Sequence, residues 1–259
     1  MAKSSLLGQL ALGVTALAAI VFSASQVKPI YVGQAPVVQR LVQATWRDSA
    51  AVRAPWAINT KETALASAQF ETDRRAFAAD LAATGRMSPE RADSLATFAV
   101  REAYIRRVPP ALVFGVLLTE NATFKSRARS NVGAVGLMQV YGKIWVPTLG
   151  RFFGRDLRDD ETNLRYGVHI LSHYVNTVAM KSADAASDAG GTVRTALLRY
   201  NGCVRGTNTP NCRTYPDKVM AAVERYAQAQ CGDDGFEVCV AQPLRLRLDA
   251  QPVQMTAGL

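Results

Sequence analysis

Apolar residues in this chain of 259 residues recur at three- and four-residue spacings, which is the period of an α-helix. Three runs show the pattern: Val113, Val116, Leu117 and Glu120; Leu164, Val168, Leu171, Val175 and Val178; and Val193, Ala196, Leu197 and Tyr200. No stretch of any length alternates between polar and apolar residues as a half-buried strand does. The sequence therefore predicts an all-α fold, or one that is nearly so.

Helix boundaries follow from capping residues. Ser88-Pro89-Glu90 supplies a capping hydroxyl, a proline and an acid in the order that begins a helix. The sequence also predicts helix starts at Pro109-Pro110, at Asp160-Glu161 and at Pro216, the last helix continuing to about Ala229. Gly190-Gly191 should break the chain ahead of a short helix that ends at Asn201-Gly202.

The remaining segments carry weaker signals. Residues 26–35 contain proline and glycine and are predicted to be a linker. Residues 35–106, rich in Ala, Arg and Leu, should form successive helices, whereas the part beyond Gly232 lacks a helical pattern and is predicted to be irregular.

The N-terminal segment predicts export. Between Leu6 and Phe22 there is no charged residue, Lys3 precedes this run, and Ser23-Ala24-Ser25 offers the small residues that a signal peptidase cuts after. Residues 1–25 are thus expected to be a signal peptide or a retained membrane anchor. The expected location is the periplasm or the outer face of the inner membrane, and any membrane association would be through this segment.

The four cysteines fit an exported protein, because disulfides form in oxidising compartments. We expect the pairs Cys203–Cys212 and Cys231–Cys239, each closing a short loop, although four cysteines allow three connectivities and the sequence does not choose among them. The sequence contains no CxxC pair, which disfavours a zinc site. His169 and His173 stand four residues apart but have no evident third ligand, so neither a metal nor a cofactor is expected.

The net charge of +9 favours polyanionic partners, or else reflects a solvated, arginine-rich surface. No zinc finger, RNA-binding signature or long basic run accompanies this charge, so nucleic acid is not an expected partner. The oligomeric state does not follow from the sequence.

Glu120 is the anomaly of the chain, since it places a carboxyl group on an apolar helical face. A carboxylic acid donates protons near neutral pH only when its pKa is raised, and a desolvated setting raises it. On this helix alone, the simpler interpretation is an exposed glutamate, or one paired with Lys125 or an arginine.

Four segments in order change that interpretation. They are "LLTENATF" at 117–124, "GAVGLMQV" at 133–140, "NLRYGVHIL" at 163–171 and "ALLRYNG" at 196–202. Together they resemble the soluble-type lytic transglycosylase (SLT) domain, a relative of goose-type lysozyme with a lysozyme-like fold. The resemblance covers roughly residues 101–230, between a helical N-terminal lobe at 26–100 and the tail at 231–259.

The resemblance implies roles for five residues. Glu120 would be the catalytic acid and base, and Gln139 would orient polar groups of the sugar. Tyr200 and Asn201 would lie near the acid, with the Tyr200 hydroxyl in hydrogen-bond reach of the reacting centre, and Ser130 would contact the muramyl side chain. The chain departs from the family pattern at Asn121, where serine is common, and at Tyr141-Gly142, where a hydrophobic residue and proline often stand.

A single-acid mechanism is favoured because no Asp or Glu occurs in 121–155 or in 189–216. The family's reaction cleaves the β-1,4 bond between N-acetylmuramic acid (MurNAc) and N-acetylglucosamine (GlcNAc) in peptidoglycan glycan strands. It leaves 1,6-anhydromuramyl ends. Two alternatives stay open: a goose-type hydrolase that adds water, and a non-catalytic wall-binding or assembly-accessory protein.

Overall fold

The structure is a computed structural model that describes residue 49 and residues 51–182, 184–203 and 212–250. From residue 51 onward these belong to one compact unit. The expected signal or anchor at 1–25 and the linker at 26–35 lie outside the described residues. Within the described ranges, no helix has both the length and the apolar character needed to cross a bilayer.

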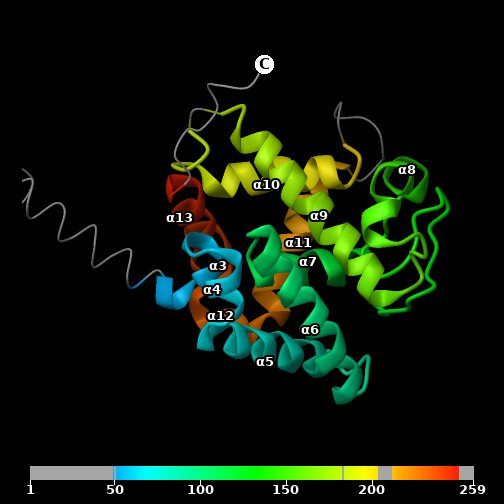
Figure 1. Ribbon diagram of the computed structural model, residues 1–259, viewed down its shortest axis with the longest axis horizontal. Coiled ribbons are helices and arrows are strands. Elements are labelled where there is room, and N and C mark those ends of the chain that lie inside the picture. The colour runs from blue at the N-terminus through cyan, green and yellow to red at the C-terminus, as the bar shows by residue number, and fades with distance from the viewer. Residues whose placement is uncertain (1–48, 50, 183, 204–211, 251–259) are drawn as a thin grey trace, which may run out of the picture. The chain divides into compact units, whose positions relative to one another are not determined.

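The described part of the chain is helical, and its only strand-like pairings are the isolated bridges Arg129–Val135 and Val135–Val140. The predicted all-α fold is confirmed. The elements, labelled as in Figure 1, are α3 (Pro55–Ile58), α4 (Lys61–Leu65), α5 (Ala68–Ala83), α6 (Pro89–Arg106), α7 (Pro110–Glu120), α8 (Gly142–Phe153), α9 (Asp160–Ala179), α10 (Ala189–Tyr200), η2 (Cys212–Thr214), α11 (Tyr215–Tyr226), α12 (Gln228–Cys231), η3 (Gly232–Asp234), η4 (Glu237–Ala241) and α13 (Gln242–Ala250).

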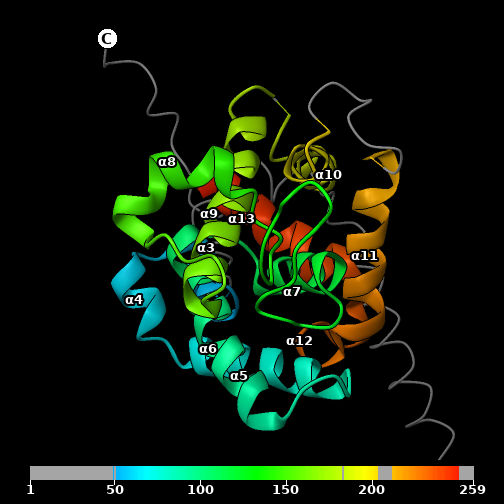
Figure 2. The same ribbon diagram turned by 90° about the vertical axis from the view of Figure 1, so that its right-hand side faces the viewer.

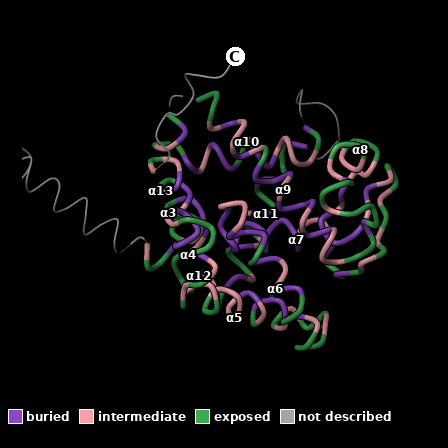
Figure 3. The backbone as a smooth tube through the Cα atoms, viewed as in Figure 1, coloured by how far each residue is buried: buried purple, intermediate pink, exposed green. Residues whose placement is uncertain are grey.

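Helix α7 lies at the centre of the unit in both ribbon views (Figures 1 and 2). Every residue from Pro110 to Leu118 is buried, and the tube drawing shows this helix in the burial colour (Figure 3). A helix that is apolar on all sides is stable only when neighbours cover all of it. The candidate acid therefore sits at the end of the most enclosed helix, where that helix emerges from the core.

The N-terminal helices are part of the same core rather than a separate lobe. Helix α6 packs against both α5 and α9, and Phe77 on α5 meets Phe114 on α7 edge-to-face at a centroid distance of 5.5 Å. Ser67 and Ser88 cap α5 and α6 by accepting hydrogen bonds from backbone N–H groups three residues on, as the capping pattern at Ser88 predicted.

Helix α10 begins earlier than predicted. It includes Gly190 and Gly191, because the Asp188 carboxylate accepts a 2.8 Å hydrogen bond from the Gly191 N–H and caps the helix ahead of the glycine pair. The glycines lower helix propensity but do not interrupt the helix here.

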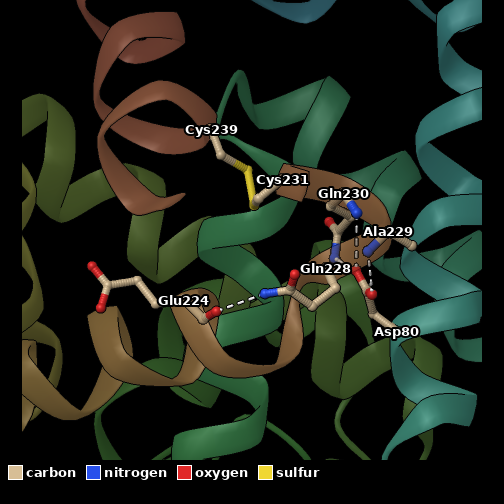
Figure 4. Close-up of a disulfide and its surroundings, with 7 residues drawn as sticks. All are labelled: Asp80, Glu224, Gln228, Ala229, Gln230, Cys231 and Cys239. Carbon is tan, nitrogen blue, oxygen red and sulfur yellow. Dashed lines mark hydrogen bonds between the residues drawn. A yellow bond between two sulfur atoms is a disulfide. The ribbon is translucent and has the colours of Figure 1, made fainter. Parts of the chain in front are cut away.

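The prediction of an irregular segment beyond Gly232 is wrong for residues 237–250, which form the π-helix η4 and helix α13. Val240 and Leu244 are fully buried there. The short, unevenly wound turns blur the 3.6-residue period, which is why the pattern is weak in the sequence. Asp80 on α5 accepts hydrogen bonds from the backbone N–H groups of Ala229 and Gln230 and so anchors α12, beside the Cys231–Cys239 disulfide (Figure 4).

Both disulfides have the expected connectivity. Cys203 pairs with Cys212 across a Cα–Cα distance of 5.6 Å, and Cys231 pairs with Cys239 across 5.2 Å. The first links the end of α10 to the segment that leads into α11, and the second ties α12 to η4. Cysteine spacing thus anticipated the cross-links that hold the C-terminal third of the unit.

Candidate active site

Glu120 is the last residue of α7, and the residue is half-buried. Burial in apolar surroundings raises the pKa of Glu120 from an ordinary 4.5 to about 7, although a hydrogen bond from Tyr215 acts in the opposite direction. Glu120 is not an exposed residue, and no salt bridge to it occurs in the described ranges, so the alternative of an exposed or ion-paired glutamate does not hold. Its carboxyl group can carry a proton at neutral pH.

Tyr215 is the direct partner of this acid, and the sequence reasoning missed it. Its hydroxyl donates a 2.5 Å hydrogen bond to Oε1 of Glu120 from the first turn of α11. Burial, followed by the charge on Glu120, raises the pKa of Tyr215 well above its usual value, so the phenol stays a neutral donor. Its position just before Pro216, at the predicted helix start, was the only available signal.

Tyr200, which the resemblance placed near the acid, lies in the same group but bonds elsewhere. Its hydroxyl donates to the Met138 carbonyl at 2.9 Å. Burial raises the pKa of Tyr200, and the charge on Glu120 contributes next, which places the two side chains close enough to interact. In the described contacts Tyr200 therefore supports the "GLMQ" loop, and Tyr215 makes the hydrogen bond to Glu120.

The loop at 133–140 folds back on itself. Gln139 has a left-handed backbone with φ 46°, and its Nε2 donates to the Gly136 carbonyl at 2.8 Å. Gly136 has φ 84°, and a Cβ there would overlap the Asn163 side chain and approach the Leu157 carbonyl oxygen to 2.6 Å. Only glycine fits this turn.

Two buried asparagines hold this loop against the helices. Asn121, directly after the acid, donates from Nδ2 to the carbonyls of Lys125 and Gly136 at 2.8 and 3.2 Å. Asn163 on α9 accepts from the Met138 N–H at 2.7 Å and donates to the Val135 and Leu157 carbonyls. Asn121, where the family commonly has serine, thus supports the loop by hydrogen bonding, and the role of Asn163 was not anticipated.

The two remaining predicted residues bond to their own local backbone. Ser130 accepts a 3.0 Å hydrogen bond at Oγ from the Ala134 N–H and so closes a turn before the "GLMQ" loop. Asn201 is half-buried and caps α10 through its backbone N–H, which bonds the Leu197 carbonyl. Neither is in contact with Glu120 through a described hydrogen bond.

The two histidines pack against aromatic rings. His169 meets Phe153 edge-to-face at 5.3 Å, and His173 meets Trp145 at 6.0 Å. Burial lowers the pKa of His169 to about 4. These contacts give both imidazoles a packing role.

The first acids that follow Glu120 in the chain have structural partners. Asp156 pairs with Arg158, Asp160 with Arg91 and Glu161 with Arg165, at 2.8, 3.1 and 2.7 Å. Asp159 caps α9 by accepting a 2.8 Å hydrogen bond from the Thr162 N–H. The predicted helix start at Asp160-Glu161 is confirmed.

Residues 98–207 match the family model described as the transglycosylase SLT domain. This segment is therefore similar to an SLT domain. The family that this model describes is lysozyme-like and all-α, and the match supports a lytic-transglycosylase-type function on peptidoglycan in general. No curated protein and no solved structure matches the chain.

The SLT match ends before α11. Glu120, Gln139 and Tyr200 lie inside the matched segment, whereas Tyr215 lies beyond it. Helix α11, beyond the SLT segment, thus adds a residue that bonds the acid. The helices on either side of the segment pack into the same core.

Proposed function

We propose that this protein is a peptidoglycan lytic transglycosylase that cleaves the MurNAc–GlcNAc β-1,4 bond and leaves 1,6-anhydromuramyl ends, with Glu120 as its single acid and base. The observation that carries the proposal is the Glu120 carboxyl group. It stands at the end of a buried helix, with its pKa raised to about 7 by burial and with Tyr215 bonded to Oε1.

The first step needs a proton on the bridging oxygen. Because Tyr215 donates to Oε1, that oxygen is occupied as an acceptor, and Oε2 is the atom left to hold the transferable proton. Near neutral pH about half of a population with a pKa of about 7 is protonated. Glu120 would protonate the leaving oxygen while the substrate's acetamido group assists at the anomeric carbon.

The second step returns the proton. The ionised Glu120 would accept the proton of the sugar's own C6 hydroxyl as that oxygen attacks the anomeric carbon, so no water is consumed. The phenol of Tyr215 would stabilise the carboxylate between the two steps by charge-assisted hydrogen bonding. A second carboxylate is not required, and the first acids that follow Glu120 in the chain already serve in ion pairs and a helix cap.

The test is digestion of purified peptidoglycan followed by mass spectrometry of the products. We expect anhydro-ended muropeptides, lighter by one water than the corresponding reducing-end products. Glu120→Gln should abolish the product, whereas Glu90→Gln, at an exposed position on α6, should retain activity. Reducing ends would indicate a goose-type hydrolase instead, and equal action or inaction of wild type and Glu120→Gln would reject catalysis by this site.

We also propose that the protein acts outside the cytoplasm. Two disulfides and the apolar run from Leu6 to Phe22 support export. Fractionation of cells with intact-mass measurement tests it: an extracytoplasmic protein is expected, either shortened near residue 25 or retained on the membrane. Recovery of the full chain from the cytosol with reduced cysteines would contradict the proposal.

A further inference from the structure

Helix α8 lies at the edge of the unit in both ribbon views (Figures 1 and 2). Half of its twelve residues are large and apolar: Ile144, Trp145, Val146, Leu149, Phe152 and Phe153. Gly150 is nevertheless the only residue of this helix that is buried. A surface helix ordinarily turns its apolar side chains toward the core, so α8 carries more apolar surface than its packing covers.

The two faces of α8 have different surroundings. On the inner face, which packs on α9, the Trp145 ring meets the Tyr174 ring edge-to-face at a centroid distance of 6.3 Å. On the outer face, Ile144 is 61% exposed and Phe152 is 63% exposed. Thr148 is also exposed and stands four residues from each, so these three side chains share one side of the helix. The outer face thus presents two large apolar side chains to solvent.

The loop before α8 adds a third apolar side chain, Val132, which is 74% exposed. A Cβ on the neighbouring Gly133 would lie 3.9 Å from Cε2 of Tyr141, which directly precedes α8, so this loop lies beside the start of the helix. We call residues 125–155 the α8 lobe. Three of the six exposed large apolar residues in the described part of the chain belong to it. A group of such residues, unlike a single one, marks an interaction surface.

The α8 lobe is also positively charged, since the chain has no Asp or Glu from residue 121 to residue 155. Its exposed cations are Lys125, Arg127, Arg129, Lys143, Arg151 and Arg155. None of them takes part in an ion pair with another described residue. The guanidinium carbon of Arg151 lies 4.6 Å from the Phe152 ring centroid, so charge and exposed apolar surface lie side by side. The lobe therefore favours a partner that is both anionic and apolar.

We propose that the outer face of α8, together with Val132, binds the surface of an acidic phospholipid bilayer. Ile144 and Phe152 enter the boundary between headgroups and acyl chains, and Lys143 and Arg151 bind lipid phosphates. An acidic polymer in water would pair with the cations but leave the apolar side chains exposed, whereas a bilayer accepts both kinds of group. Binding of this kind goes beyond the proposed cleavage and does not depend on it.

The test uses the full-length chain with Thr148→Cys carrying an environment-sensitive dye, since all four native cysteines are in disulfides. The readout is dye emission rather than binding, because the apolar run at 6–22 is expected to tether the chain to any bilayer. Emission should shift to shorter wavelength with phosphatidylglycerol vesicles and stay unchanged with phosphatidylcholine vesicles. The same dye at Thr72→Cys, an exposed position on α5, should show no shift with either.

Two double variants of the labelled chain separate the two contributions. Lys143→Gln/Arg151→Gln should reduce the shift at saturating lipid about twofold or more, and high salt should weaken the shift of the unsubstituted chain. Ile144→Ser/Phe152→Ser should abolish the shift, because it removes the side chains that enter the bilayer. All four side chains are exposed, so both variants should keep the melting temperature of the labelled chain.

The matched control is Lys218→Gln/Arg225→Gln, which removes two exposed cations of α11 and should leave the shift unchanged. An absent shift with acidic vesicles, or an equal shift with both kinds of vesicle, would overturn the proposal. So would equal losses of the shift in this control and in Lys143→Gln/Arg151→Gln. A shift with purified glycan strands but not with vesicles would assign the α8 lobe to the wall polymer and likewise overturn it.

Discussion

At the scale of single residues, the chemistry depends on two opposing effects on one carboxyl group. Burial at the end of α7 raises the pKa of Glu120, and the hydrogen bond from Tyr215 lowers it, leaving a value of about 7. A phenol suits this position, since its own pKa is raised by burial and it donates without adding a charge. A lysine or arginine there would hold the carboxylate ionised and leave no proton to give.

Replacing Tyr215 with phenylalanine removes the hydrogen bond and keeps the ring. Because that hydrogen bond lowers the pKa of Glu120, its loss should raise the pKa further. In the proposed mechanism the protonated acid begins the reaction, so wild-type kcat/KM should fall as pH rises through about 7. In Tyr215→Phe this limb should move to higher pH by about half a unit to one unit, and kcat should fall about tenfold. A pH–rate profile measures both, and an unshifted limb would contradict the role given to Tyr215.

Glu120→Gln should change the pH dependence of stability. The folded-state pKa of Glu120 is raised above its unfolded value, so the folded state binds the proton more tightly. As pH rises from about 4.5 to above 7, the cost of a buried carboxylate appears in wild type and is absent from the glutamine variant. Thermal unfolding should show the variant more stable at pH 8, on the order of 1–3 kcal/mol, with little difference at pH 4. A pH-independent difference would mean that the acid is solvated.

At the scale of elements, the site depends on how closely α11 approaches α7. Gly115 faces α11, where a Cβ would come to 2.6 Å from Cγ2 of Val223 and 2.9 Å from the Val219 carbonyl oxygen. The glycine thus lets the helices lie close enough for Tyr215, at the start of α11, to reach Glu120, at the end of α7. The close approach of α7 and α11 and the hydrogen bond from Tyr215 to Glu120 therefore depend on each other.

Gly115→Ala is therefore expected to reduce both stability and activity, although alanine is the better helix former. Overpacking at this helix contact should cost about 1–3 kcal/mol of unfolding free energy, and kcat should fall with it as Tyr215 moves from Glu120. Gly190→Ala in α10 is the matched control: no atom lies within 4 Å of the added methyl, so it should stabilise by up to about 1 kcal/mol. Denaturant unfolding and initial rates of both variants test this prediction. A Gly115→Ala variant with unchanged unfolding free energy and kcat would show that the helix contact can relax.

Helices that begin with a capping side chain were predictable from the sequence, and elements without such a cap were not. Helix α6 has Ser88 as its cap, and α9 begins after the Asp159 cap, so their starts followed from the residues. Helix α8 has no side-chain cap and contains Pro147, and its sequence gave no prediction. In η4 and α13 a change of helical winding concealed a buried apolar face. Helix starts could be predicted where a side chain caps the backbone, whereas the other elements depend on tertiary packing.

At the scale of the whole molecule, the candidate site joins residues that are far apart in the chain. The hydrogen bond from Tyr215 to Glu120 links positions 95 residues apart, and that from Tyr200 to Met138 links positions 62 apart. The resemblance located the acid and the "GLMQ" loop because each is a local string. It did not reveal Tyr215, since that contact is created by the packing of α11 on α7.

The Cys203–Cys212 disulfide lies between the two tyrosine-bearing segments, with Tyr200 before it and Tyr215 after it. Each disulfide closes a loop of similar size, with sequence separations of 9 and 8. Loop-closure entropy therefore predicts a similar cost of about 2–3 kcal/mol for losing either one. Their effects on catalysis should differ.

Cys203→Ser/Cys212→Ser should lower kcat well beyond its loss of stability, because it frees the segment that presents Tyr215 to Glu120. Cys231→Ser/Cys239→Ser is the control, since α12 is also anchored by Asp80, and it should lower the melting temperature while leaving kcat near that of wild type. Rates measured well below each melting temperature, together with calorimetry, separate the two effects. Equal losses of kcat in both variants would mean that the disulfides act on stability alone, and that packing of α11 on α7 is sufficient to hold the tyrosine against the acid.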